Sequence, residues 1–174
     1  GDVIGPDGRP QRLGGLLEGK INVLSFIYTR CTDPSACPSA TGMLRKVREA
    51  SEMDRVIAEN VNLITMSFDP GHDTPDLMGR YGRAFRGDAG GAEWLFLTTR
   101  SPKELKPILQ EYGQLVERKP NPKDSYGPLF HTVRVYLIDR AGRIRNIYSM
   151  GLLDPRLVLA DIRTLLLEEI SKGA

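Results

Sequence analysis

The sequence has few of the residues that mark membrane, nucleic-acid-binding and disulfide-rich proteins. Among its 174 residues there are only two cysteines, two histidines and one tryptophan. Two cysteines allow at most one disulfide, too few for a disulfide-rich scaffold, and no apolar run reaches the length of about 18 residues that predicts a membrane-spanning helix. Twenty-four basic and 22 acidic residues give a net charge of +2. That charge is too small to predict binding to nucleic acid.

What the chain does have is the composition of an ordinary globular domain. Hydrophobic residues make up 40% and charged residues 26%, and both values are usual for a folded domain. A chain of this length is long enough to bury a substantial core. We therefore expect one domain that covers residues 1–174.

The two cysteines follow a run that predicts a buried strand. Residues 21–30 are nearly all apolar or β-branched, which is typical of a strand covered on both faces. After Cys31 and Cys37, apolar residues recur at helical spacing. The thiols are therefore expected in a strand-to-helix turn, where helix N–H groups favour a thiolate. This position suits redox exchange, soft-metal binding or both.

The rest of the chain alternates predicted strands and helices. Turn residues 5–8 predict an N-terminal hairpin, and residues 139–142 predict a late one. Between them, periodicity predicts further strands at residues 61–68, 94–98 and 132–138, helices up to about residue 60 and from residues 75, 102 and 155, and a long loop at residues 117–128. This order indicates an α/β fold with a central mixed sheet flanked by helices. A cysteine pair after the first buried strand of such a fold points to a thioredoxin-like domain.

Residue chemistry alone leaves the role of the cysteines open. Cys31 and Cys37 could form a structural disulfide, cycle as a redox-active pair or bind a metal. His131 lies between the long loop and a predicted strand, where a histidine is either structural or a ligand. Two thiolates and an imidazole would suit Cu(I), but reduced thiols also suit zinc.

Three segments in order resemble the signatures of the Sco/SenC family. They are residues 26–31 with Cys37 and Pro38, residues 67–75, and His131 with the strand that follows it. The resemblance covers most of the chain. It implies a thioredoxin-like fold that binds copper, as Cu(I) and in some states Cu(II), through Cys31, Cys37 and His131.

The same resemblance implies a role, partners and a location. Sco-family proteins are metallochaperones that help to assemble the binuclear copper site of cytochrome c oxidase. The expected partners are the copper-receiving oxidase subunit or another copper chaperone. The family is usually anchored on the outer face of the inner membrane, in the periplasm, so we expect an N-terminal anchor that is absent from this chain.

One feature differs from the family pattern. Five residues separate Cys31 from Cys37 here, whereas the family usually has three. A longer spacer changes disulfide strain and the geometry of a shared ligand set. The alternative function is therefore a thiol–disulfide oxidoreductase or redox sensor that uses Cys31 and Cys37 without delivering metal.

Several further residues are candidates for supporting roles. Asp73 and Asp69 are carboxylates that could orient His131 or fix the cysteine loop, or simply close a turn and favour a helix start. We interpret His72 as a solvated residue, with a surrogate ligand as the alternative. Asp33, inside the spacer, is a candidate extra oxygen ligand, and Met43 has the helical spacing of a core residue.

Overall fold

The computed structural model describes residues 1–86 and 90–172 and has a five-stranded sheet at its centre. The strand order is β5-β4-β3-β8-β9. β3 and β4 run parallel, as do β4 and β5, while β8 and β9 are antiparallel to their neighbours. The sheet is therefore mixed, and the fold is the thioredoxin-like α/β architecture that the sequence predicts.

The elements follow one another in an alternating order along the chain. The central strands are β3 (Ile21–Ile27), β4 (Val61–Ser67), β5 (Glu93–Leu97), β8 (Arg134–Ile138) and β9 (Ile144–Ser149). The helices are α1 (Leu13–Leu17), α2 (Cys37–Glu52), α3 (Arg55–Asn60), α4 (Pro75–Arg86), α5 (Pro102–Glu111) and α6 (Pro155–Lys172), with a 3-10 turn η1 (Met150–Leu152). Two small hairpins pair β1 (Asp2–Ile4) with β2 (Pro10–Arg12), and β6 (Val116–Arg118) with β7 (Leu129–His131).

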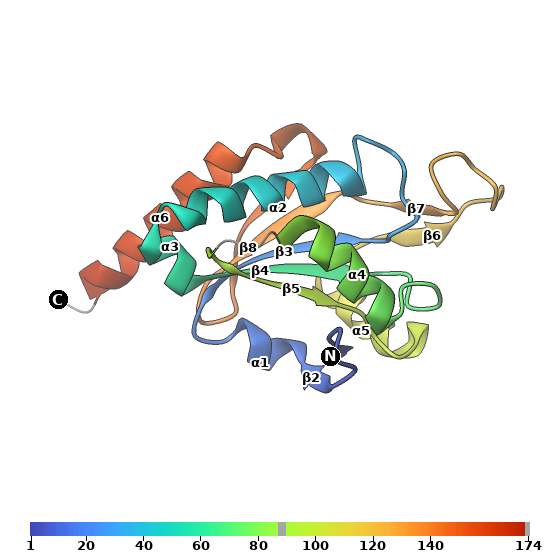
Figure 1. The fold of residues 1–174 in the computed structure, drawn as a ribbon, viewed down its shortest axis with the longest axis horizontal. Coiled ribbons are helices and arrows are strands. Elements are labelled where there is room, and N and C mark those ends of the chain that lie inside the picture. Colours follow the sequence, from blue (N-terminus) through green and yellow to red (C-terminus); the bar gives the residue numbers. More distant parts are fainter. Residues whose placement is uncertain (87–89, 173–174) are drawn as a thin grey trace.

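Helices cover both faces of the sheet. Figure 1 shows α2 and α6 on one face and α1 and α5 on the other. α4 joins the first face, because Thr41 of α2 and Tyr81 of α4 share a hydrogen bond of 2.9 Å. Every residue of β3 and β4 is buried, which explains why both strands are mostly apolar or β-branched. None of the helices in the described ranges is long and apolar enough to cross a membrane.

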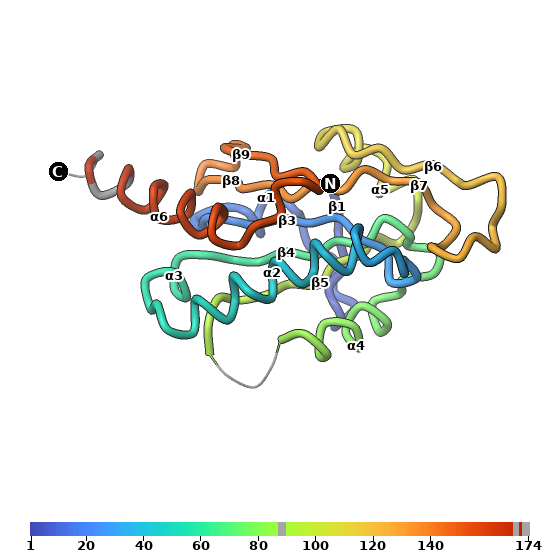
Figure 2. The backbone as a smooth tube through the Cα atoms, turned by 90° about the horizontal axis from the view of Figure 1, so that it is seen from above, coloured from blue at the N-terminus to red at the C-terminus, as the bar shows by residue number. Residues whose placement is uncertain are grey.

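The β6–β7 hairpin lies beside the ends of β3 and β4, at the same end of the molecule as the cysteine loop (Figures 1 and 2). Its strands correct the prediction of a loop over residues 117–128, because Glu117 and Arg118 belong to β6. A strand of three residues gives too short an alternation for periodicity to detect. The late hairpin and the strand before it are confirmed, with β8 beginning at Arg134.

One predicted helix is two helices in the structure. The segment from Pro38 to Asn60 breaks at Met53 and Asp54, and the Asp54 side chain accepts a hydrogen bond from the Ile57 N–H at 3.2 Å. This N-cap starts α3 in a new direction. The short helix α1 was also not predicted, because five residues are too few to show helical periodicity.

Candidate metal centre

Cys31, Cys37 and His131 converge at the end of the sheet where β3 and β4 finish. Their ligand atoms, two sulfurs and one ring nitrogen, all lie within 4.8 Å of one another. The Cys37 sulfur and the His131 Nε2 atom are 3.3 Å apart. Both cysteines are free thiols and buried. The fold thus brings together three residues that are up to 100 positions apart in the chain.

The two thiols differ sharply in acidity. The Cys37 thiol hydrogen-bonds to the Cys31 sulfur and holds the pKa of Cys31 at about 4, far below its ordinary value of 9.0. His131 lowers that pKa further, while burial opposes both effects. The same bond to Cys31, together with burial, raises the pKa of Cys37. The contact between the two sulfurs therefore favours the thiolate on Cys31 and the proton on Cys37.

Two aromatic rings hold the imidazole of His131 in place. The Phe68 ring lies 5.0 Å from the imidazole, centroid to centroid, and the Tyr28 ring meets it edge-on at 5.5 Å. Tyr28 and Phe68 also contact each other at 5.2 Å. Because Tyr28 follows β3 and Phe68 follows β4, the orientation of the histidine is set by the rigid centre of the sheet.

The Tyr28 hydroxyl also anchors the loop that leads to His131. It donates to the backbone carbonyls of Tyr126 and Leu129, at 3.0 Å and 3.4 Å. Gly127 lies between them with a φ of +96°. A Cβ atom at this glycine would stand 2.3 Å from the Tyr28 hydroxyl, so only glycine permits this close approach.

The five residues between the cysteines form a compact outward turn. The Asp33 carboxylate accepts hydrogen bonds from the backbone and the hydroxyl of Ser35, at 2.9 Å and 2.7 Å. The Thr32 hydroxyl donates to the Ser125 carbonyl at 2.6 Å, which ties the spacer to the β6–β7 loop. The extra residues are thus absorbed as a turn, and α2 still begins at Cys37.

Asp73 fixes the cysteine loop rather than the histidine. Its buried carboxylate accepts the Thr29 N–H at 3.0 Å, the Thr29 hydroxyl at 2.5 Å and the Ser67 hydroxyl at 2.5 Å. No contact between Asp73 and His131 occurs among the described residues. Two supporting roles were predicted for Asp73, to orient His131 or to fix the cysteine loop, and the structure favours the second. Asp69 supports the same loop from outside through an ion pair of 2.7 Å with Arg30.

The other candidates lie apart from the three ligand atoms. His72 is exposed, in the turn before α4, and does not belong to the Cys–Cys–His cluster found in the described part of the chain. Asp33 uses its carboxylate within the spacer. Met43 is buried in α2 and packs in the core, as its helical spacing predicts.

Sequence reasoning missed the residues that position the histidine. Tyr28 lies in the run of residues 21–30 that predicts a buried strand, and that pattern does not reveal that its ring contacts His131 and its hydroxyl holds the loop before it. Phe68 is the last residue of the predicted strand 61–68, and the strand pattern gives no sign that its ring contacts the histidine. A signal was present, because each aromatic residue comes directly at the end of a buried strand, where parallel strands place their loops together.

The donor set fits a soft metal ion. Sulfur-to-metal distances are about 2.3 Å and nitrogen-to-metal distances about 2.0 Å, so ligand atoms within 4.8 Å of one another can share one ion with little movement. Two sulfurs and one imidazole nitrogen form a soft set that suits Cu(I). Binding requires both thiols as thiolates, so the proton on Cys37 has to leave.

Comparison with known proteins agrees with this geometry. The family model described as SCO1/SenC matches residues 14–167. No curated protein matches the chain. The family match spans the cysteine turn, Asp69, Asp73 and His131, so every residue of the candidate centre lies inside it.

Three solved structures show the same fold. Bradyrhizobium japonicum ScoI with copper bound is 28% identical, with 94% of this chain and 96% of that chain covered and a TM-score of 0.74. Apo Sco1 from Thermus thermophilus is 26% identical, with 94% and 88% covered and a TM-score of 0.76. A SCO1/SenC family lipoprotein from Bacillus anthracis is 24% identical, with 95% and 92% covered and a TM-score of 0.79.

Proposed function

Because the chain belongs to the SCO1/SenC family, we propose that it carries copper to the binuclear copper site of cytochrome c oxidase. Copper is the cargo, and Cys31, Cys37 and His131 are its ligands. The observation that supports this most directly is the convergence of two sulfurs and one imidazole nitrogen within 4.8 Å. The similar B. japonicum ScoI has been solved with copper bound.

The protonation of the free site suits loading and release. The Cys31 thiolate is ready to accept Cu(I), since the pKa of Cys31 is held at about 4. The proton on Cys37 leaves as the second sulfur binds, so metal binding and proton release are coupled. A recipient with a similar thiolate and imidazole set then takes the ion by ligand exchange.

The recipient and the location follow from the family role. We propose a copper-receiving subunit of the oxidase, or another copper chaperone, as the partner. We propose the periplasm, at the outer face of the inner membrane, as the location.

An anaerobic Cu(I) titration tests the proposal. The reduced protein competes with a chromophoric Cu(I) chelator, and the wild type is compared with His131→Ala and His72→Ala. We expect one tightly bound ion, with affinity at least about tenfold lower in His131→Ala, because one of three ligands is lost. His72→Ala is the matched control and keeps the wild-type affinity. Equal affinity in wild type and His131→Ala would exclude the three-ligand site.

A second candidate function is supported by the asymmetry of the thiols. A thiolate at Cys31 beside a thiol at Cys37 is the arrangement of a dithiol reductant. Cys31 would attack a partner disulfide and form a mixed disulfide, and Cys37 would resolve it. The two thiols are oxidised to one disulfide, and the partner disulfide is reduced to two thiols. Reduction that requires both cysteines and survives His131→Ala would favour this function over copper delivery.

A further inference from the structure

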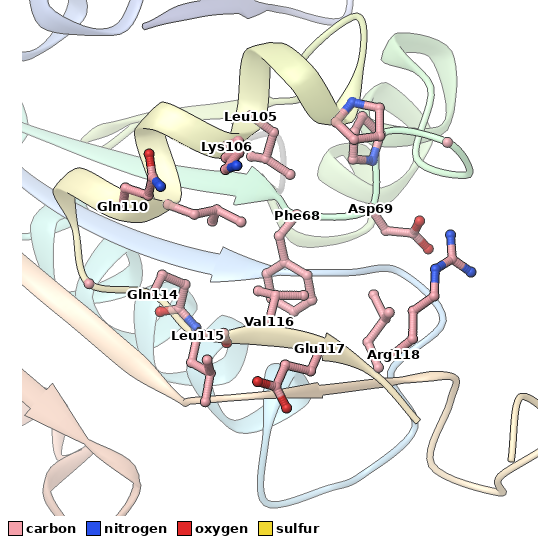
Figure 3. A pocket seen from close by; sticks show the side chains of 16 residues that line it. Phe68, Asp69, Leu105, Lys106, Gln110, Gln114, Leu115, Val116, Glu117 and Arg118 are labelled. Atoms are coloured by element: carbon pink, nitrogen blue, oxygen red, sulfur yellow. Dashed lines mark hydrogen bonds between the residues drawn. The ribbon is translucent and has the colours of Figure 1, made fainter. Parts of the chain in front are cut away.

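A groove of about 520 Å³ lies between α5 and β6. Figure 3 shows α5 along one wall, the edge of β6 along the other and Phe68 between them. Leu105 of α5 lines the same groove and is buried in the core. Because the Phe68 ring also contacts His131, the groove adjoins the candidate metal centre without containing any of its ligands.

The wall formed by β6 is a free strand edge. The Lys119 N–H donates to the Pro128 carbonyl, and the Thr132 N–H donates to the Leu115 carbonyl. Hydrogen-bonded positions alternate along an antiparallel pair, so the backbone N–H and C=O groups of residues 115, 117 and 119 face β7. The backbone groups of Val116 and Arg118 face the opposite way, and both residues line the groove. Within the described residues, nothing pairs with those backbone groups.

Two basic and two acidic residues line the groove, and they differ in whether they have partners. Lys106 and Arg118 line it, and neither has an ion-pair partner among the described residues. Asp69 also lines it, but its carboxylate is held by Arg30 at 2.7 Å. Figure 3 shows the Glu117 carboxylate pointing away from the groove. Two cations without partners therefore face a segment that binds there.

We infer that an extended segment of a partner protein, apolar at alternate positions and acidic at its ends, adds as a strand to the free edge of β6. An extended backbone supplies the donors and acceptors that Val116 and Arg118 lack, whereas a helix has already used its own. Alternate apolar side chains fit the groove beside Phe68 and Leu105, and the acidic ends meet Lys106 and Arg118. A partner docked in this way is held next to His131.

Metal-free protein and synthetic peptides test the inference independently of copper. The probes are a panel of short capped peptides that alternate valine or leucine with threonine and carry aspartate at both ends. The matched panel carries lysine at the ends. We expect the aspartate peptides to bind at least about tenfold more tightly than the lysine peptides, with a preference that weakens at high salt.

Backbone amide exchange measured by NMR distinguishes strand addition from binding through side chains alone. On peptide binding we expect slower exchange at the Val116 and Arg118 amides. The Glu117 and Lys119 amides already face β7 and should change little. Binding without protection at Val116 and Arg118 overturns the inference, as does the absence of binding by every peptide in the panel.

Two substitutions of Arg118 distinguish the contribution of its backbone N–H to peptide binding from that of its charge. Arg118→Gln removes the cation and keeps the N–H, whereas Arg118→Pro removes both and leaves the bonds to β7 intact. We expect Pro to weaken peptide binding about tenfold more than Gln. Phe130→Ala changes an exposed ring at a position paired with Glu117, away from the free edge, and should leave binding unchanged. Equal binding by Pro and Gln variants that are both folded would contradict strand addition.

Discussion

The Asp73 carboxylate accepts two hydrogen bonds from Thr29, one from its backbone N–H and one from its hydroxyl. The two residues are 44 positions apart, in the loops that follow β4 and β3. This buried contact fixes the start of the turn that carries both cysteines. Through it, the loop after β4 helps to determine where the thiols lie.

Asp73→Asn should destabilise the fold. The new amide places a donor where the structure needs only acceptors, and hydrogen bonds to a buried carboxylate contribute about 2 kcal/mol. We therefore expect the free energy of unfolding in urea to fall by about 2 kcal/mol or more. Asp76→Asn is the control, because Asp76 forms an exposed ion pair with Arg80, and such pairs contribute at most about 1 kcal/mol. An equal loss of unfolding free energy in both variants would show that the contact between Asp73 and Thr29 stabilises the fold no more than an exposed ion pair does.

Tyr28→Phe should lower the Cu(I) affinity and have only a small effect on the free energy of unfolding. The variant keeps the ring against His131 and loses only the hydroxyl that holds the Tyr126 and Leu129 carbonyls. We expect a loss of about 1 kcal/mol in stability and about tenfold in Cu(I) affinity, since residues that orient a ligand have effects of that size.

Tyr136→Phe is the matched control for Tyr28. Its hydroxyl donates to the Tyr112 carbonyl at 2.8 Å, away from the metal ligands. The control should show a similar loss of stability with unchanged Cu(I) affinity. If both variants bind Cu(I) like the wild type, the Tyr28 hydroxyl does not position the histidine.

Gly127→Ala should destabilise the protein more than Gly142→Ala. Both glycines have positive φ, +96° and +78°, so both variants incur backbone strain. A Cβ at Gly142 meets nothing within 4 Å, whereas one at Gly127 overlaps the Tyr28 hydroxyl. We expect an extra loss of at least about 1 kcal/mol at Gly127, measured by thermal or urea unfolding. A smaller loss at Gly127 than at Gly142 would mean that the loop moves freely away from Tyr28.

The Cys31 thiolate should persist to acidic pH. In the reduced, metal-free protein we expect thiolate absorbance near 240 nm to disappear with a midpoint near pH 4, because the pKa of Cys31 is about 4. Cys37→Ala removes the main hydrogen-bond donor and should raise this midpoint. A single midpoint near the ordinary thiol value of 9.0 in the wild type would contradict the proposed thiolate.

The same shift predicts how stability depends on pH. The pKa of Cys31 is lower in the folded state than in the unfolded chain, so the thiolate stabilises the fold fully only above the unfolded pKa. This contribution should decrease as pH falls from about 9 towards about 4. Cys31→Ala lacks it, so the difference in unfolding free energy between wild type and variant should narrow over that range.

The sequence predicted the sheet and the three clustered residues for physical reasons. Long buried strands such as residues 21–27 and 61–67 are rich in apolar and β-branched residues, and the turn after the first of them carries both cysteines. His131 was selected by its resemblance to a family signature, since a lone histidine carries no pattern of its own.

The parts that sequence reasoning missed depend on contacts between distant residues. β6 and β7 are three residues each and form because they pair with one another, which no local pattern records. The hydrophobic spacing around Asp54 is that of one continuous helix. Only the side-chain cap shows that the helix breaks there. The bond from Tyr28 to residues about 100 positions later is likewise a product of the fold.

The outward turn between Cys31 and Cys37 has a consequence for how such chains are recognised. Because the turn takes up the additional residues, a spacer of five residues still leaves the two sulfurs within 4.8 Å of each other. A search motif that fixes the number of residues between the cysteines would pass over this chain. A motif that combines a variable spacer with Asp73 and His131 would retain it, and would separate it from unrelated proteins that merely have two nearby cysteines.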